Sequence, residues 1–231
     1  MIYGIGDLHF DPIGEKPMDV FGEKWINHKE KIIESWKSKV KDDDMVLLPG
    51  DISWGLKLSE SVLDLELIDS LPGYKIISKG NHDYWWSSIS KLDELKLKRT
   101  KFLYNNSHTF EDYAIVGTRG WISKDMSEFK KADEKIYNRE VIRLENSIKA
   151  AEKGKKLIAM IHYPPYNQDF SANEFSNLLT KSGVEICIYG HLHAEGHRQV
   201  FEGIKNEVLY KCVSSDYIDF KLQEIVDGKG N

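Results

Sequence analysis

Residue types that bind metals are concentrated in five short segments, each placed just after a run of apolar residues. In two of them the candidate side chains are two positions apart, in Asp7-Leu8-His9 and His191-Leu192-His193. The full set of candidates is Asp7, His9, Asp51, Asn81, His82, His162, His191 and His193. Imidazole, carboxylate and amide groups together suit divalent first-row metals such as Mn, Fe, Co, Ni or Zn. Because none of the segments contains cysteine, a structural zinc site built from thiolates is not expected.

The size of this set indicates two metal ions rather than one. Seven of the side chains could act as ligands, which exceeds the needs of one ion but matches two ions that share a carboxylate. Two ions roughly 3.5–4 Å apart form a clamp for in-line displacement at phosphorus. The set therefore predicts a phosphoesterase site that holds two divalent metal ions.

Predicted strands would deliver the five segments to one place. Short apolar runs bounded by Gly, Pro, Asn or Asp indicate strands at residues 2–5, 45–48, 74–77, 102–104, 113–116, 157–161 and 184–189. Ligands of open α/β sheets gather beyond the carboxyl ends of the strands, so we expect five strand ends to form a single site. If the first strand persists through Asp7 and His9, its alternation points both side chains to one side.

Helical periodicity appears between the strands. One predicted helix carries Ile26, Ile33, Trp36 and Val40 on one face, and another carries Tyr137, Val141, Leu144 and Ile148. The second is expected to begin near Ser127 and to stop at Gly154. This alternation of strands and helices indicates an α/β fold with parallel neighbours.

The tail of the sequence has a different character. Residues 208–210, 212–213 and 217–225 read as consecutive strands with no helix between them. A mixed α/β (α+β) fold with two packed sheets and helices outside therefore fits better than a doubly wound sheet. We expect a single domain over residues 1–231, because no linker, repeat or low-complexity segment interrupts it.

In their residues and order, the five segments resemble the calcineurin-like metallophosphoesterases, and the resemblance extends from Asp7 to His193. It implies a β-sandwich of two sheets flanked by helices, in four layers. It implies one metal ion held by Asp7, His9, Asp51 and His193, and a second held by Asp51, Asn81, His162 and His191, with Asp51 bridging. His82 would lie outside the metal shell, beside the scissile phosphate.

The resemblance also implies the reaction, which is hydrolysis of a phosphoric monoester or diester. A hydroxide bridging the ions would attack phosphorus in line, and the catalytic His82, if protonated, would donate to the leaving oxygen. In the protein-phosphatase branch, an aspartate three residues after the bridging one orients this histidine, whereas Trp54 stands there in this chain. That branch also has glutamate at the position of Asp83. The sequence thus looks like the small bacterial-type phosphohydrolases.

Two other functions are compatible with these residues. A nuclease is disfavoured by the net charge of −5 and by the lack of an extended basic track. A non-catalytic scaffold or protein-binding module on the same fold is disfavoured because every ligand position and His82 are intact. We therefore expect a small phosphorylated substrate as partner, and neither nucleic acid nor a membrane.

Further residues near the segments allow two interpretations. Aromatic rings on three of the loops could stack a nucleobase of a nucleotide-like substrate, or simply pack the loops; they are Trp54, Tyr84, Trp85, Trp86, Tyr163 and Tyr166. Arg119 could hold a phosphate or be ion-paired, and the second is favoured. His28, His108 and His197 fall outside the segments and are taken as incidental.

Two remaining features bear on the location of the protein. Cys187 and Cys212 are expected to be buried free thiols, since two cysteines do not make a disulfide framework. Met1 leads directly into the first predicted strand, and no apolar run approaches the length of a membrane span. These observations predict a cytoplasmic protein.

Overall fold

A computed structural model describes residues 1–227 and contains two β-sheets. The first has the order β11 (Gln223–Val226), β1 (Ile2–Gly4), β2 (Met45–Leu48), β3 (Tyr74–Ser78), β4 (Thr100–Leu103). The second has the order β5 (His108–Phe110), β6 (Tyr113–Thr118), β7 (Lys156–Ile161), β8 (Val184–Tyr189), β10 (Val208–Cys212), β9 (Gly203–Lys205). Strands β1 to β4 run parallel to one another, as do β6, β7, β8 and β10, while β11, β5 and β9 pair antiparallel.

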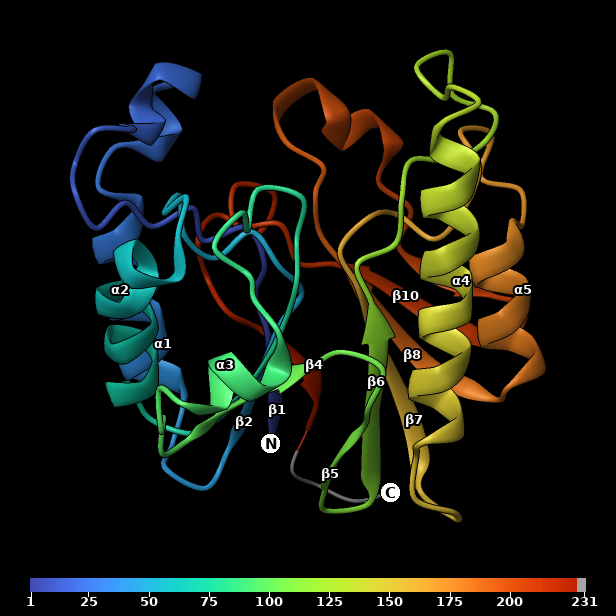
Figure 1. Cartoon of the computed structure of the whole chain (residues 1–231), viewed down its shortest axis with the longest axis horizontal. Coiled ribbons are helices and arrows are strands. Elements are labelled where there is room, and N and C mark those ends of the chain that lie inside the picture. The colour runs from blue at the N-terminus through green and yellow to red at the C-terminus, as the bar shows by residue number, and fades with distance from the viewer. Residues whose placement is uncertain (228–231) are drawn as a thin grey trace.

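Helices cover the outer faces of the two sheets (Figure 1). On the side of the first sheet lie α1 (His28–Lys39), α2 (Leu58–Ser70) and the short α3 (Ile89–Asp93). On the side of the second lie α4 (Asp133–Lys149) and α5 (Glu174–Lys181). Short 3₁₀ segments add η1 (Met18–Phe21), η2 (Glu23–Trp25) and η3 (Ala194–Gln199). The expected mixed α/β fold with two sheets and flanking helices is confirmed.

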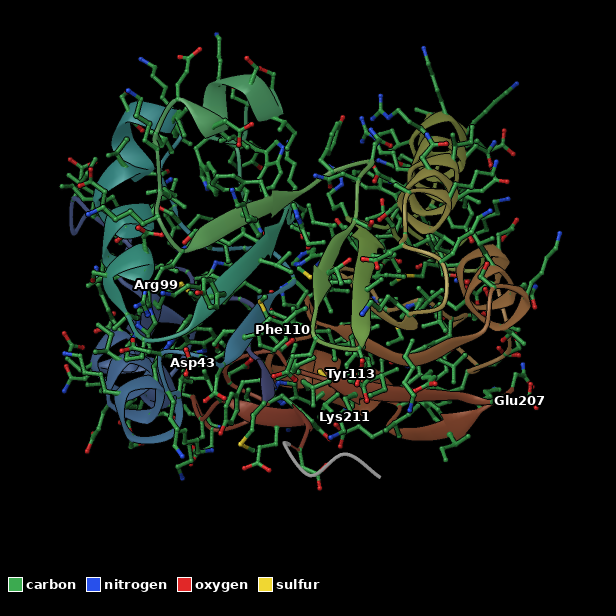
Figure 2. All side chains as sticks on the ribbon, turned by 90° about the horizontal axis from the view of Figure 1, so that it is seen from below. Asp43, Arg99, Phe110, Tyr113, Glu207 and Lys211 are labelled. Atoms are coloured by element: carbon green, nitrogen blue, oxygen red, sulfur yellow. The ribbon has the colours of Figure 1, made fainter. Side chains whose placement is uncertain are left out.

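One hydrophobic core joins the sheets. Its buried side chains include Val46 and Ile77 from the first sheet and Ile115, Ile158 and Ile188 from the second. In the view from below (Figure 2), Phe110 and Tyr113 of the β5–β6 hairpin lie where the two sheets meet. Both are partly buried against this core, so the hairpin closes it at the amino ends of the parallel strands.

Several predicted element boundaries are wrong. Ile26 lies before α1 and is 47% exposed, so it does not share the buried face of that helix. Helix α4 begins at Asp133 instead of near Ser127, because the Asp133 carboxylate binds the Lys130 amide (2.8 Å) and the Trp121 indole (3.0 Å) in a preceding turn. The helix ends at Lys149, and Gly154 belongs to the turn before β7.

The tail also differs from the prediction. Residues 208–210 and 212–213 do not form two strands, since β10 runs unbroken from Val208 to Cys212. The strand expected over 217–225 is confined to its end, in β11, because Asp219 and Phe220 adopt left-handed φ angles of 55° and 57° in a turn. No helix in residues 1–227 combines the length and the apolar character that a membrane crossing requires.

Candidate metal centre

All eight candidate side chains belong to loops at the carboxyl ends of parallel strands. Loops after β1, β2 and β3 bring Asp7, His9, Asp51, Asn81 and His82, and loops after β7 and β8 bring His162, His191 and His193. The two sheets are joined at this end by the backbone of Gly6, which donates to Val213 O (2.7 Å) and accepts from the Ser215 amide (3.2 Å). The candidates from both sheets thereby meet in one cluster, in which Asp7, His9, Asp51 and His162 are buried and the other four are partly buried.

The backbone turns sharply at several of these residues. Asp7, His9, Asp51 and His191 have φ angles of 57°, 46°, 54° and 73°. This left-handed region is costly for residues with a Cβ and is typical of functional sites. Strand β1 ends at Gly4, so the condition for strand alternation at Asp7 and His9 is not met, although both side chains do reach one group. The left-handed backbone conformations of Asp7 and His9 orient the two side chains instead.

Two glycines let the loops approach the buried carboxylates. A Cβ on Gly80 would clash with the Asp51 carboxylate and amide, and a Cβ on Gly190 would lie 2.5 Å from Asp7 Oδ2. Without these side chains, the His82 amide donates to Asp51 Oδ1 (2.8 Å) and the His191 amide donates to Asp7 Oδ2 (2.9 Å). The glycines therefore fix the orientation of both aspartates.

The first group of possible ligand atoms belongs to Asp7, His9 and His193, whose atoms lie within 4.8 Å of one another. His193 Nε2 is 3.5 Å from Asp7 Oδ1, and it is a buried atom with no hydrogen-bond partner among the described residues. The opposite ring nitrogen, Nδ1, is 2.7 Å from Asp216 Oδ1. Burial lowers the pKa of His193, but Asp7 and Asp216 overcome this effect and raise it to about 10. The surroundings therefore favour a cation at this point.

The second group contains Asp7, Asp51 and His162, again within 4.8 Å. His162 Nε2 lies 3.4 Å from Asp51 Oδ2 and 2.6 Å from Asn81 Oδ1, while its Nδ1 is 2.9 Å from the Pro49 carbonyl. Burial lowers the pKa of His162 to about 4, which leaves a neutral ring with one N–H. If this N–H donates to Pro49 O, the lone pair of Nε2 faces the lone pairs of Asn81 Oδ1. A cation between them would satisfy both.

His191 and Asp51 extend this second group. His191 Nδ1 is 2.9 Å from Asn81 Oδ1, and burial lowers the pKa of His191 to about 3, so this ring too is neutral. Burial and the nearby carboxylates of Asp83 and Asp7 raise the pKa of Asp51 well above its usual value. Crowded buried carboxylates disfavour their own ionisation unless a cation compensates them. The donors of both groups are therefore suited to divalent metal ions.

Two buried aspartates support these side chains, although the sequence analysis did not assign them this role. Asp83 accepts hydrogen bonds from the amides of Asp51 (2.8 Å), Ile52 (2.8 Å) and Gly80 (2.7 Å) and from the Trp85 indole (2.9 Å). Asp216 contacts His193 and accepts from the Ala194 amide (3.1 Å). The signal for Asp216 was its position just after a predicted strand, at the same edge as the other candidates.

His82 lies at the mouth of the cluster and is half-buried. Its ring is 4.8 Å from the Trp54 ring and 5.8 Å from the His9 ring, and it makes no ion pair with a carboxylate in the described part of the chain. Trp54 stacks on His9, with centroids 4.8 Å apart and planes at 24°. Trp54 thus covers the candidate ligand His9 and contacts His82 through its ring. An aspartate at this position would instead place a negative charge beside His82.

The other residues singled out from the sequence differ in how far they are buried. Trp85, Tyr163 and Tyr166 are buried, whereas Tyr84 is 62% exposed beside His82. Arg119 is ion-paired with Glu140 (3.3 Å), as favoured from the sequence. Cys187 and Cys212 are buried free thiols, as predicted.

Two histidines outside the predicted segments contact the cluster. His197 lies 3.2 Å from Asp216, and His28 Nε2 lies 3.3 Å from the His9 carbonyl, so treating both as incidental is wrong. The third, His108, lies in β5 at the edge of the second sheet, where it contacts the Phe102 carbonyl of β4 in the first sheet.

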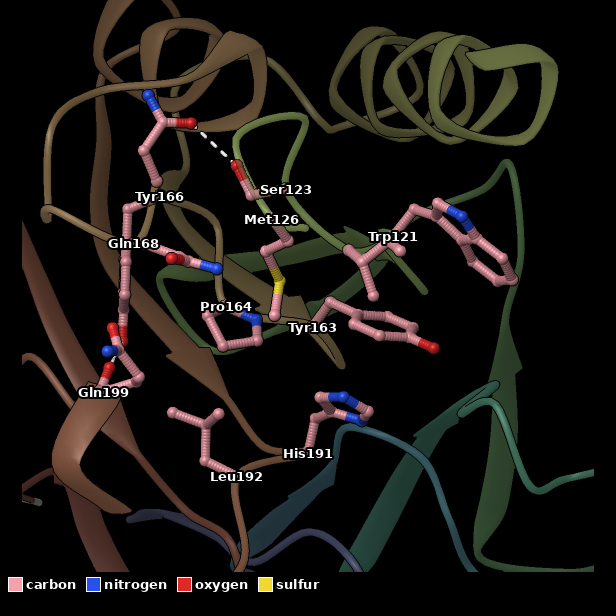
Figure 3. Close-up of a pocket in the computed structure, with 12 residues that line it drawn as sticks. Trp121, Ser123, Met126, Tyr163, Pro164, Tyr166, Gln168, His191, Leu192 and Gln199 are labelled. Carbon is pink, nitrogen blue, oxygen red and sulfur yellow. Dashed lines mark hydrogen bonds between the residues drawn. The ribbon is translucent and has the colours of Figure 1, made fainter. Parts of the chain in front are cut away.

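A small apolar pocket of about 80 Å³ adjoins His191 (Figure 3). Its walls come from the loops after β6, β7 and β8, and they include Trp121, Met126, Tyr163, Pro164 and Leu192. Tyr163 packs against His191 with the ring centroids 4.0 Å apart. Apolar side chains therefore line one edge of the candidate metal centre.

Comparisons with known proteins agree with this arrangement. The family described as calcineurin-like phosphoesterase matches residues 1–195. Among curated proteins, no match was found. A phosphopantetheinyl hydrolase from Mycobacterium tuberculosis has a similar structure, with a TM-score of 0.59 and 13% identity over 100% of this chain and 97% of that one. A protein of unknown function from Aquifex aeolicus has a TM-score of 0.51 and 18% identity over 96% of this chain and 94% of that one.

Proposed function

Because the chain belongs to the calcineurin-like phosphoesterase family, we propose that it hydrolyses phosphoric esters with the help of two divalent metal ions. The observation that carries this proposal is two adjoining donor groups, one of Asp7, His9 and His193 and the other of Asp7, Asp51 and His162, in which only His193 is partly exposed. Such a pair of groups suits two ions close together, which is the arrangement that promotes in-line displacement at phosphorus.

We assign one ion to Asp7, His9, Asp51 and His193, and the other to Asp51, Asn81, His162 and His191. The position of Asp51 supports its role as the bridge. Its Oδ2 is 3.9 Å from His9 Nε2 on one side and 3.4 Å from His162 Nε2 on the other. Asp216 supports the first set, since a carboxylate on the far nitrogen of a ligating histidine fixes its orientation.

The metal ions, when bound, would supply a nucleophilic hydroxide at neutral pH and offset charge on the phosphoryl oxygens. The chain itself positions the substrate. His82 is the catalytic residue, because its ring stands at the mouth of the cluster while its amide is tied to Asp51. From there its N–H can donate a hydrogen bond to a phosphoryl oxygen. Burial lowers the pKa of His82, so only the protonated ring, once the substrate's negative charge favours it, can give a proton to the leaving oxygen. Trp54 and the apolar residues beside His191 limit access of water.

The test begins with protein stripped of metal and reloaded with Mn, Ni, Co or Zn. We expect metal-dependent hydrolysis of aryl phosphate monoesters or diesters, and a ratio of two metal ions per chain by elemental analysis. Asp51→Asn should lose most activity and metal, while Asp93→Asn, the same change at an exposed position, serves as control. Because the similar Mycobacterium protein is a phosphopantetheinyl hydrolase, a phosphopantetheine ester belongs in the substrate panel.

His82→Ala separates catalysis from metal binding. We expect it to bind both ions and to turn over substrate at least about 100-fold more slowly, the size of a typical general-acid contribution. Loss of metal from His82→Ala would contradict its position outside the metal shell. Absence of hydrolysis with every metal would instead favour the scaffold function.

A further inference from the structure

A second cavity, of about 490 Å³, lies beside the candidate metal centre. Its residues follow β3 (Lys79), β4 (Tyr104) and β6 (Arg119), and α4 closes it from outside. In the two sheets, β4 is next to β3 and β6 is next to β7, and β4 contacts β6 (Figure 1). Relative to the candidate metal centre, the cavity is therefore shifted by one strand, in the same direction in both sheets. With strands about 4.8 Å apart, it lies roughly 5–10 Å from Asn81 and His162.

Positive charge dominates this cavity. Its lining includes Lys79, Arg119, Arg139 and Arg143 but only one carboxylate, that of Glu140. The buried Glu140 pairs with Arg119 and Arg143. Within residues 1–227, Lys79 and Arg139 form no ion pair. A chain whose net charge is −5 thus concentrates an excess of three positive charges here.

Two residues that line the cavity also carry covered N–H groups without a partner. Arg119 Nε and Trp86 Nε1 are buried atoms that lack a hydrogen-bond partner among the described residues. A buried N–H without an acceptor destabilises a structure, so such donors are uncommon unless a ligand or water satisfies them. The planar guanidinium of Arg119 is held by Glu140 and by the Trp121 ring (4.5 Å), which leaves Nε oriented by its neighbours. Fixed guanidinium groups suit phosphate oxygens.

We propose that this cavity binds a second phosphoryl group of the substrate, so that the preferred substrates carry two phosphates separated by a short organic group. The proposal rests on the function proposed above, in which the scissile phosphoester lies at the metal ions. Lys79 connects the two sites, because it directly precedes the Gly80–Asn81 turn at the metal centre. A dianionic phosphate offsets most of the excess charge and offers acceptors to Lys79 and Arg139, the two lining cations that have no ion pair within residues 1–227.

The kinetic test compares a nucleoside 5′-monophosphate with the corresponding nucleoside 3′,5′-bisphosphate. The quantity measured is the ratio of their kcat/KM values. We expect the wild type to prefer the bisphosphate, and Arg139→Gln and Lys79→Gln each to lower the ratio by about 10-fold, the usual effect of one charged hydrogen bond. Lys37→Gln, an exposed lysine on α1 in the opposite layer, is the matched control and should leave the ratio unchanged. An unchanged ratio in the double variant Lys79→Gln/Arg139→Gln would overturn the proposal.

A binding test separates this proposal from the hydrolase function. Metal-free protein, kept in a chelator, is titrated with inorganic phosphate and followed by ³¹P NMR. We expect binding to wild type and to Lys37→Gln, and a loss of at least about 10-fold in affinity in Arg139→Gln. Arg139 is exposed on α4, so this variant is expected to fold even if Lys79→Gln does not. Phosphate binding without hydrolysis by any metal-loaded form would refute the proposed function alone, whereas hydrolysis without phosphate binding would refute the cavity alone.

Discussion

The most informative perturbation is Asp83→Asn, because the Asp83 carboxylate joins two of the loops that carry candidate ligands. Its Oδ2 accepts from the amides of Asp51 and Gly80, and its Oδ1 accepts from the Ile52 amide and the Trp85 indole. Asparagine keeps one of the two oxygens, so in either orientation its NH₂ group faces two N–H donors that have lost their acceptor.

The size of the effect follows from these contacts. A hydrogen bond to a charged group contributes about 1.5–3 kcal/mol, so two lost bonds cost about 3–6 kcal/mol. Part of this is offset, because burial raises the pKa of Asp83 and a neutral amide avoids that burial cost. We therefore expect a net decrease of about 2–4 kcal/mol in the free energy of unfolding, or about 5–15 °C in Tm for a chain of this length.

Urea unfolding of the metal-free proteins measures this decrease directly. Asp93→Asn makes the same chemical change at an exposed position and should stay within about 0.5 kcal/mol of wild type. Because Asp51 and Gly80 lose their common anchor, we also expect metal affinity to fall by about 10–100-fold. A free energy of unfolding for Asp83→Asn equal to that of Asp93→Asn would refute the reasoning.

Three other perturbations test separate parts of the structure. Asp216→Asn removes the carboxylate that orients His193, so metal affinity measured by competition with a chelator should fall by about 10–100-fold. Gly80→Ala places a Cβ against the Asp51 carboxylate and should lower both Tm and metal content, whereas Gly196→Ala, whose Cβ meets no atom closer than 3.6 Å, should lower neither. Lys75 is buried, and burial lowers its pKa from 10.5 to about 8, so the unfolded chain binds more protons above pH 8. From pH 8 to 9.5 the free energy of unfolding should therefore rise by about 1.5 kcal/mol more in wild type than in Lys75→Met, as followed by urea unfolding.

The sequence predicts the parallel core of the fold well, since its strands are short apolar runs buried on both faces. Residues 45–48 and 184–189 are strands with the bounds expected from the sequence. Prediction fails where a local interaction competes with periodicity. Ser127 looks like the start of a helix, but Asp133 binds the preceding amide and indole, and α4 begins there. Helix α2 carries a weak hydrophobic pattern, with Leu63 exposed and Asp64 buried, and was missed.

For the candidate site, residue types and their positions after strands were sufficient to identify the side chains that the structure brings together. They were not sufficient to find what orients those side chains. Asp83 looks like one more residue of a Gly-Asn-His-Asp turn, and only its four short contacts distinguish it as an anchor. Asp216 is 23 residues from His193 in the sequence, and its contacts with His193 and His197 depend on the parallel pairing of β8 with β10.

The same contacts explain why the cluster is confined to one end of the sandwich. Left-handed turns at Asp7 and Asp51 are costly, as is the crowding of buried carboxylates that raises the pKa of Asp51. Such unfavourable conformations persist only where other contacts hold the backbone in place. Here these contacts are the hydrogen bonds of Gly6 between the two sheets and the hydrogen bonds of Asp83 between the β2 and β3 loops. Binding of a divalent cation stabilises the folded chain, because the positive charge of the ion offsets the repulsion between the crowded carboxylates. The hydrogen bonds of Gly6 and Asp83 thus hold the carboxylates close together in the positions that a metal ion needs. Removing these hydrogen bonds should therefore reduce both the free energy of unfolding and the metal affinity.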